Sequence, residues 1–132
     1  MKQMRTTLIV LAFAVAAGPA VANDVFGIWQ TEKNNEGKYL EVEVHACEAD
    51  PAKVCGTIVA AKGGAEQSVV GKPMIWDMAV DAANEWDDGK IWKPDDDEVY
   101  SSQMQLEGNT LTVSGCVLGG LICRSQAWPR VK

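Results

Sequence analysis

Residues 115–130 read GCVLGGLICRSQAWPR, and the prediction of the fold starts from this stretch. Two short apolar arms flank Gly119-Gly120, a dipeptide that accepts the positive φ angles of a tight hairpin turn. Cys116 and Cys123 stand on opposite arms, at positions that can face each other across such a hairpin. The stretch therefore predicts a β-hairpin that is pinned by a disulfide.

Similar short β-rich runs, separated by turn residues, follow one another along the chain. In one of them Glu41, Glu43 and His45 alternate with Val42, Val44 and Ala46, the period of a half-buried strand. The expected strands are Val25–Thr31, Tyr39–Cys47, Cys55–Ala61, Met74–Val80, two arms around a hairpin at Asp87-Asp88-Gly89, Val99–Leu106, Leu111–Cys116 and Leu121–Val131. About eight strands with short links predict an all-β fold, a single eight-stranded antiparallel up-and-down barrel, because a Greek-key sandwich needs a long crossing connection.

The start of the chain predicts export. Lys2 and Arg5 precede an apolar run at Leu8–Ala17, and Ala20-Val21-Ala22 is a pattern that signal peptidase accepts. The run is shorter than the roughly 20 residues of a spanning helix, which argues against an uncleaved membrane anchor. We expect a signal-peptide helix at residues 1–22, a barrel domain at 23–132, a periplasmic or secreted location, and no stable membrane insertion after cleavage.

The mature chain is strongly acidic. Residues 1–22 hold two of the 12 basic side chains and none of the 18 acidic ones, so residues 23–132 carry a formal charge of about −8. Nucleic acids and anionic membrane surfaces would repel such a chain, and neither is expected as a partner. The sequence contains no feature that defines an oligomeric state.

The four cysteines, Cys47, Cys55, Cys116 and Cys123, all lie in the mature chain, where an oxidising compartment favours disulfides over metal ligation. Three pairings are possible. The two local pairs are favoured, because the loop containing Asp50-Pro51 returns Cys55 towards Cys47 and Gly119-Gly120 does the same for the second pair. A zinc site is the alternative, but the spacings do not match those of zinc knuckles.

Several residues carry a resemblance to known families. The first strand contains Gly27-x-Trp29 and the last strand contains arginines, a pattern similar to that of the lipocalin and calycin superfamily. The chain more closely resembles an uncharacterised family of small exported bacterial proteins, a domain of unknown function with a lipocalin-like fold. The matching residues are Gly27, Trp29, Cys47, Cys55-Gly56-x-Ile58, Gly71, Trp86, Gly89-Lys90-Ile91, Pro94, Tyr100, Leu111, Gly115-Cys116 and Arg124-x-Gln126-x-Trp128-x-Arg130.

The resemblance implies structural roles for the two ends of the barrel. In the superfamily the tryptophan plugs one end, and an arginine of the final strand packs across it. For this chain we therefore expect Trp29, two residues after Gly27, to contact Arg130, or Arg124 in its place. No function comes with the family.

Candidate catalytic and metal-binding residues receive little support. His45 is the only histidine and shares a strand face with Glu41 and Glu43, which indicates a solvated face more than a general base or ligand. The run at residues 95–98 is acidic but lacks the ligand spacing of a calcium loop. The sequence also lacks a Gly-x-Ser-x-Gly elbow. We expect no cofactor, no metal and no enzymatic activity.

Tryptophan is abundant, with five residues, and core packing is expected to use at least three of them. The residues expected to contact a ligand are Trp86 and Trp92, around the predicted Asp87–Gly89 hairpin, with Tyr100 and Met104. Arg124, Gln126 and Trp128 share one face of the last strand with Arg130. If that face points inward, Arg124 can pair with an acidic head group. If it points outward, Arg130 is a latch over Trp29 or a residue that faces solvent.

An eight-stranded barrel either fills with side chains or holds one small ligand. The sequence accordingly supports two hypotheses. The first is an exported non-enzymatic binding protein for a small apolar or weakly acidic ligand, with an interior lined by Val42, Val44, Ile58, Met104, Leu106 and Val113. The alternative is an envelope structural or protein-interaction module with a filled core.

Overall fold

The computed structural model describes residues 24–132, and its regular elements are eight strands and two short 3₁₀ turns. The predicted signal peptide at residues 1–22 and the cleavage site before Asn23 lie outside the described residues. Among the residues that are described, no helix is long and apolar enough to cross a membrane. The strands are β1 (Gly27–Gln30), β2 (Tyr39–Ala46), β3 (Val54–Lys62), β4 (Pro73–Ala82), β5 (Glu85–Lys93), β6 (Glu98–Glu107), β7 (Thr110–Val117) and β8 (Ile122–Pro129), with 3₁₀ turns η1 (Gln67–Val69) and η2 (Leu118–Gly120).

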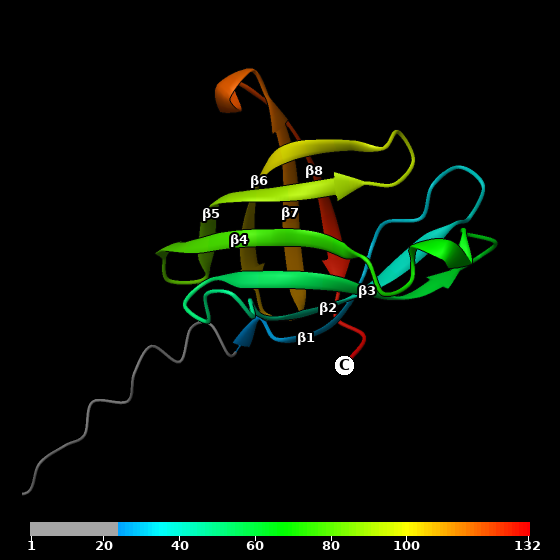
Figure 1. The fold of residues 1–132 in the computed structure, drawn as a ribbon, viewed down its shortest axis with the longest axis horizontal. Coiled ribbons are helices and arrows are strands. Elements are labelled where there is room, and N and C mark those ends of the chain that lie inside the picture. Colours follow the sequence, from blue (N-terminus) through cyan, green and yellow to red (C-terminus); the bar gives the residue numbers. More distant parts are fainter. Residues whose placement is uncertain (1–23) are drawn as a thin grey trace, which may run out of the picture.

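Each strand pairs antiparallel with the next, in the order β1 to β8, and the sheet curls into a half-barrel. Figure 1 shows β7 and β8 running at a steep angle to β4 and β5. The ends of the sheet meet at a bridge between Trp29 and Arg130. There Ile28 N donates to Lys132 O at 2.6 Å, and Val131 N donates to Ile28 O at 2.7 Å. The all-β, eight-stranded antiparallel prediction is confirmed.

Alternating side chains build the core on the concave face of this sheet. On β2, Val42 and Val44 are buried, while Glu43 between them is exposed. Three tryptophans, Trp29, Trp86 and Trp128, are at most 1 % exposed. Burying one large apolar side chain stabilises a fold by roughly 1.5–3 kcal/mol, so these strands are held together mainly by this core. The core fills much of the half-barrel with side chains.

The prediction of a hairpin at Asp87-Asp88-Gly89 is wrong, because β5 is continuous through these residues. The register passes from Trp86 opposite Met104 to Gly89 opposite Ser102, which places a β-bulge at the acidic pair. Asp88 has a φ of 59°, and a short polar residue before glycine suits the left-handed backbone of a bulge as well as that of a turn. The chain instead reverses at residues 83–84, between β4 and β5.

Both local cysteine pairs form disulfides. Cys47–Cys55 joins the ends of β2 and β3 with a Cα–Cα distance of 5.0 Å, and Cys116–Cys123 joins β7 to β8 at 4.1 Å. The two-residue turn expected at Gly119-Gly120 is wrong in its length. Residues 118–121 connect the strands, and η2 occupies the first three of them, because Leu118 itself adopts a φ of 54° and widens the turn.

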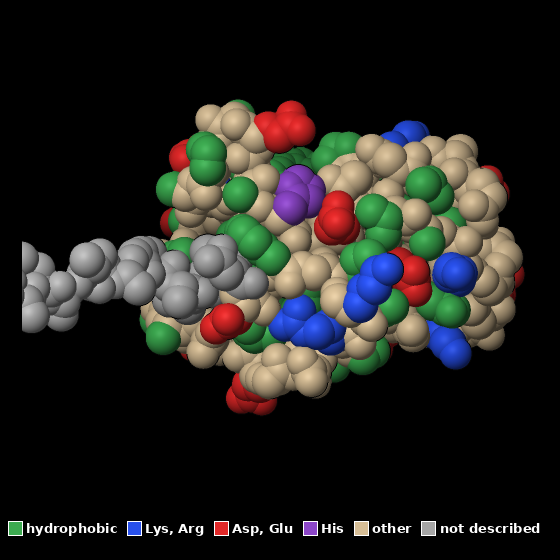
Figure 2. All heavy atoms as spheres, turned by 90° about the horizontal axis from the view of Figure 1, so that it is seen from below, with side chains coloured by type: hydrophobic (Ala, Val, Ile, Leu, Met, Phe, Trp, Pro, Cys, Tyr) green, Lys and Arg blue, Asp and Glu red, His purple; other side chains and the backbone are tan. Residues whose placement is uncertain are grey.

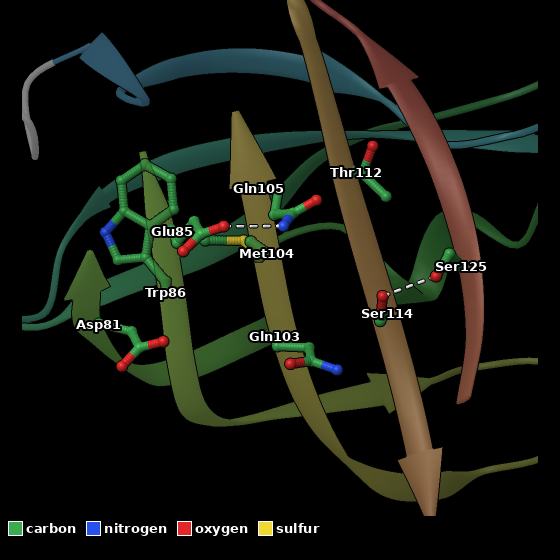
Figure 3. Close-up of a pocket in the computed structure, with 9 residues that line it drawn as sticks. All are labelled: Asp81, Glu85, Trp86, Gln103, Met104, Gln105, Thr112, Ser114 and Ser125. Atoms are coloured by element: carbon green, nitrogen blue, oxygen red, sulfur yellow. Dashed lines mark hydrogen bonds between the residues drawn. The ribbon is translucent and has the colours of Figure 1, made fainter. Parts of the chain in front are cut away.

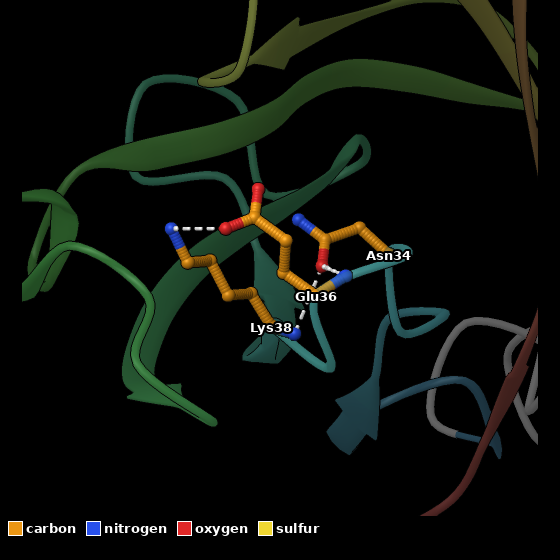
Figure 4. Close-up of polar contacts among 3 residues, drawn as sticks. All are labelled: Asn34, Glu36 and Lys38. Atoms are coloured by element: carbon orange, nitrogen blue, oxygen red, sulfur yellow. Dashed lines mark hydrogen bonds and ion pairs between the residues drawn. The ribbon is translucent and has the colours of Figure 1, made fainter.

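The connection between β1 and β2 is ordered by one asparagine side chain. Asn34 Oδ1 accepts hydrogen bonds from the backbone N–H groups of Glu36 and Lys38, at 2.9 and 3.0 Å (Figure 4). Lys38 Nζ also lies 3.5 Å from Glu36 Oε2. An asparagine that bonds the backbone two residues ahead is a common way to build a tight turn. The connection thus reaches β2 in a defined position.

Candidate functional site

A pocket of about 480 Å³ opens between the ends of β5 and β6 on one side and β7 and β8 on the other. We call it the mouth pocket. Its volume lies in the roughly 300–1,000 Å³ range of ligand sites. Its apolar lining comprises Met74, Ile91, Val113, Val117, Ile122 and Trp128. Its polar lining comprises Glu32, Lys93, Asp96, Tyr100, Arg124, Ser125 and Gln126, with Gly115 between the two groups.

Strand pairing explains why these residues meet. Gly115 lies opposite Arg124 and Val113 lies opposite Gln126, so the concave face of β7 continues onto β8. Side chains directly opposite each other in a sheet share one face. Arg124, Gln126 and Trp128 therefore belong to the inward face of the last strand, which was the orientation that the sequence left open.

Polar contacts hold the wall formed by β8 and the β1–β2 connection. Gln126 Oε1 accepts from Trp128 Nε1 at 2.7 Å and from the backbone N–H of Glu32 at 3.3 Å. The Glu32 carboxylate accepts from the backbone N–H of Ala127 at 2.8 Å. The indole of Trp128 is thereby fixed at the inner end of the pocket.

The opposite wall carries a phenol and a carboxylate that bond to each other. Tyr100 OH donates to Asp96 Oδ2 at 2.8 Å, and Asp96 Oδ1 accepts from the backbone N–H of Glu98 at 3.1 Å. The hydrogen bond to Asp96 raises the pKa of Tyr100 above its ordinary value, while the positive charge of Arg124 acts in the opposite direction. The phenol therefore stays protonated at neutral pH and remains a donor.

The two cations of the mouth pocket, Arg124 and Lys93, form no ion pair within 4.0 Å in the part of the chain that the structure describes. Residues 24–132 form one ion pair, between Lys38 and Glu36, which is elsewhere. The side chains of Arg124 and Lys93 make no hydrogen bond to any described residue, whereas the carboxylates of Glu32 and Asp96 both accept from neutral donors. An anionic group in the pocket can therefore pair with Arg124 and Lys93 without breaking an existing contact.

The residues expected to contact a ligand fall in three places. Arg124 and Tyr100 line the mouth pocket. Trp92 does not: its Nε1 donates to Asp97 Oδ1 at 2.9 Å, and Lys72 Nζ lies 5.6 Å from its ring centroid. Trp86 and Met104 are buried in the core, at 1 % and 2 % exposure.

Sequence reasoning missed much of the lining. It did not select Lys93, Ile91, Val117 or Ile122, which are part of the mouth pocket. Of the six apolar residues expected to line an interior, Val113 is the one in this pocket, and the other five are buried in the core. The signal that could have found Ile122 is its place two residues before Arg124, on the same face of the strand.

A second pocket, of about 250 Å³, touches Trp86 and Met104 and is otherwise lined by polar residues of β4 to β8 (Figure 3). Many of these groups already bond to one another. Gln105 Nε2 donates to Glu85 Oε1 at 2.9 Å, and the hydroxyls of Ser114 and Ser125 are 2.7 Å apart. It is smaller than the mouth pocket and has no basic side chain in its lining, so it is the weaker candidate for an acidic ligand.

The expected latch between the two ends of the chain is present. The guanidinium carbon of Arg130 lies 4.2 Å from the centroid of the Trp29 ring, within the reach of a cation–π contact. Arg130 also donates to the carbonyl oxygens of Phe26 and Asp24, at 3.1 and 2.6 Å. Gly27 has a φ of 143°, and a Cβ there would collide with the carbonyl oxygen of Lys132. This position therefore requires glycine.

His45 lies on another part of the sheet. Its Nδ1 donates to the Ala46 carbonyl oxygen, and its Nε2 lies 2.8 Å from Thr57 Oγ1. No group of three or more metal-ligating side chains occurs within the described range. Figure 2, a view from below, shows acidic and basic side chains scattered over the surface among separate hydrophobic ones. These observations leave the mouth pocket as the candidate site.

Comparisons with known proteins agree with the fold. A solved structure described as "Protein HP1028 from the human pathogen Helicobacter pylori belongs to the lipocalin family" is 15 % identical, and the match covers 82 % of this chain and 83 % of that chain with a TM-score of 0.67. At this identity the likeness shows a lipocalin-like fold. No curated protein matches the sequence. The model of one bacterial family matches residues 27–130, and the chain therefore belongs to the family described as "Uncharacterized protein conserved in bacteria (DUF2147)".

Proposed function

We propose that this chain is an exported, non-enzymatic binding protein, and that it holds a small, largely apolar ligand with an acidic end in the mouth pocket. One observation carries the proposal: two cations that form no ion pair with a described residue, Arg124 and Lys93, stand beside an apolar wall in a pocket of about 480 Å³. An apolar tail against Ile91, Val113 and Ile122 would be removed from water. The acidic end would meet the cations at the rim.

Arg124 is the side chain best suited to hold a carboxylate, because its planar guanidinium can donate two parallel hydrogen bonds. Tyr100 OH already donates its hydrogen bond to Asp96. Its role is therefore to orient the acidic turn, and it does not donate to the ligand. Apolar burial with one charge-assisted contact supports micromolar affinity, which corresponds to about 8 kcal/mol. The proposed ligand class is therefore the single-chain or aromatic carboxylic acid.

Replacement of Arg124 by alanine should weaken acidic ligands about tenfold, because a hydrogen bond to a charged group contributes roughly 1.5–3 kcal/mol when shielded and less at a rim. Neutral alcohols of the same chain length should bind equally well to both proteins. The measurement is a titration of fatty acids and aromatic acids that follows tryptophan emission, since Trp128 lies in the pocket lining.

Lys90→Ala is the matched control, because Lys90 is an exposed cation of β5 that does not line the pocket. It should leave both affinities unchanged. The proposal fails if no ligand in the panel saturates. It also fails if Arg124→Ala weakens acids and alcohols to the same extent.

Export is the second part of the proposal. The mature protein should begin at Asn23, after the Ala20-Val21-Ala22 pattern. It should contain no free thiol, because all four cysteines are paired in the structure. Intact-mass measurement on protein from its own host should give the mass of residues 23–132 with no alkylation before reduction and four alkylated cysteines after it. A mass that retains residues 1–22, or alkylation before reduction, would contradict this part.

A further inference from the structure

The end of the β7–β8 hairpin exposes four large apolar side chains. Val117, Leu118, Leu121 and Ile122 are 41, 68, 86 and 54 % exposed. We call these four residues the apolar tip. Figure 1 shows this end of the hairpin projecting beyond the rest of the sheet. Single exposed apolar residues are ordinary, but four on one projecting turn indicate a surface that is covered in use.

The apolar tip contributes little to the fold. Leu118 and Leu121 belong to the connection between the strands, and neither packs in the core. The Cys116–Cys123 disulfide joins the two strands next to the turn, so the tip is held in place without burial of its own side chains. Two leucines at these exposures are thus free to contact another molecule.

The sequence segment that carries the apolar tip differs in charge from the rest of the chain. All 18 acidic residues precede residue 108, and residues 108–132 carry only the basic side chains Arg124, Arg130 and Lys132. Carboxylates resist transfer to an apolar environment, while the long side chain of an arginine beside an apolar segment can keep its charge in water. The hairpin therefore has the composition of a segment that enters the interface of a lipid bilayer.

The apolar tip is continuous with the mouth pocket. Val117 and Ile122 belong to both, and Arg124 follows Ile122 at the pocket rim. If the tip lies among acyl chains, the rim with Arg124 lies near the head groups. An apolar tail can then pass from the bilayer to the pocket along a surface that excludes water.

We propose that the apolar tip docks this protein onto the surface of a net-uncharged lipid bilayer, and that the mouth pocket takes its acidic single-chain ligand directly from that bilayer. The loading step rests on the proposed function, whereas the docking step does not. An uncharged surface is specified because a mature chain with a formal charge of about −8 would be repelled by anionic lipid. Four side chains support peripheral, reversible contact and not a membrane span.

The first test is sedimentation with phosphatidylcholine vesicles. The full mature protein should partition onto them, and Leu121→Asp should lower the partition coefficient about tenfold or more, a factor that corresponds to about 1.4 kcal/mol. Val80→Asp is the matched control, because Val80 is 47 % exposed on β4 and does not line the mouth pocket. It should bind like the wild type. Vesicles containing phosphatidylglycerol should bind the wild type less, most clearly at low salt.

The uncharged pair Leu118→Ser with Leu121→Ser should also lose binding, and circular dichroism should show an unchanged fold, which separates docking from misfolding. Absence of wild-type binding, or equal loss in Val80→Asp, overturns the proposal. So does a dimer in the wild type that Leu121→Asp converts to a monomer without lipid, since the tip would then be a surface for a second copy. The proposal is also overturned if the protein binds only to vesicles that carry an anchored protein and not to vesicles of lipid alone.

The second test separates docking from ligand binding. Transfer of a fluorescent fatty acid from phosphatidylcholine vesicles should be about tenfold slower for Leu121→Asp, while its affinity for the same acid in vesicle-free solution stays unchanged. Arg124→Ala should show the reverse, normal vesicle binding with weaker acid binding. If no acid binds but the vesicle result stands, the proposed function fails and docking survives. Equal transfer rates for Leu121→Asp and the wild type would overturn direct loading.

Discussion

Removal of both disulfides should lower the free energy of unfolding by about 5 kcal/mol. Each bond closes a short loop, with sequence separations of 8 and 7, and loop-closure entropy then contributes roughly 2.5 kcal/mol per bond. The two bonds lie in different hairpins, so their effects should add. Small domains have a net stability of only about 5–15 kcal/mol, and the reduced protein should therefore be marginal or unfolded at physiological temperature.

The measurement is chemical unfolding of Cys→Ala variants of each pair and of both pairs together. Alanine is preferred to serine because Cys47 and Cys116 are buried, and a hydroxyl there would add a desolvation cost. Each pair alone should cost about half of the total. A loss below about 1 kcal/mol for the quadruple variant would show that the strand core alone holds the hairpins.

Trp29→Ala should cost about 3–5 kcal/mol, the typical cost of removing a buried aromatic side chain. Trp29 is fully buried, its Nε1 donates to the Val25 carbonyl oxygen at 2.9 Å, and Arg130 lies over its ring. The change leaves a cavity at the place where the first strand meets the end of the chain. Trp29→Phe should cost less, because it keeps most of the packing and loses the hydrogen bond.

A double-mutant cycle isolates the latch from the cavity. Arg130→Met keeps the side-chain volume and removes the charge, together with the bonds to Phe26, Asp24 and Asn109. The coupling between Trp29→Phe and Arg130→Met should be small, because a phenyl ring still offers its face to the cation. The coupling with Trp29→Ala should be about 0.5–2 kcal/mol. If unfolding curves give no coupling between Trp29→Ala and Arg130→Met, the cation–π contact does not stabilise the fold.

Local patterns predicted the strands, whereas one turn was misplaced and another was predicted with the wrong length. Period-two alternation found β2, and turn residues separated β6, β7 and β8 at nearly the right positions. The errors at Asp87-Asp88-Gly89 and Gly119-Gly120 have one cause. Glycine preceded by a small or acidic residue permits left-handed backbone in hairpins, bulges and 3₁₀ turns alike, and pairing with the neighbouring strand decides among them.

The candidate site was predictable only in part. Arg124 and Tyr100 were among the residues expected to contact a ligand, and both line the mouth pocket. Trp86 and Met104 have the same alternation as the pocket residues yet lie in the core. Alternation shows which face of a strand is inward, but it does not show how far along the half-barrel a side chain lies. That depth depends on register shifts such as those between β3 and β4.

The chain's own order of residues was enough to specify eight antiparallel strands, two short-range disulfides and an acidic surface, because each depends on neighbours within one or two strands. The meeting of Trp29 with Arg130, 101 positions apart, followed from a family resemblance and is realised only when the sheet curls. The mouth pocket, the free cations at its rim and the projecting apolar tip were decided by tertiary structure. They arise where bulges, strand lengths and sheet curvature bring β5, β6, β7 and β8 together, and those quantities depend on packing across the whole half-barrel.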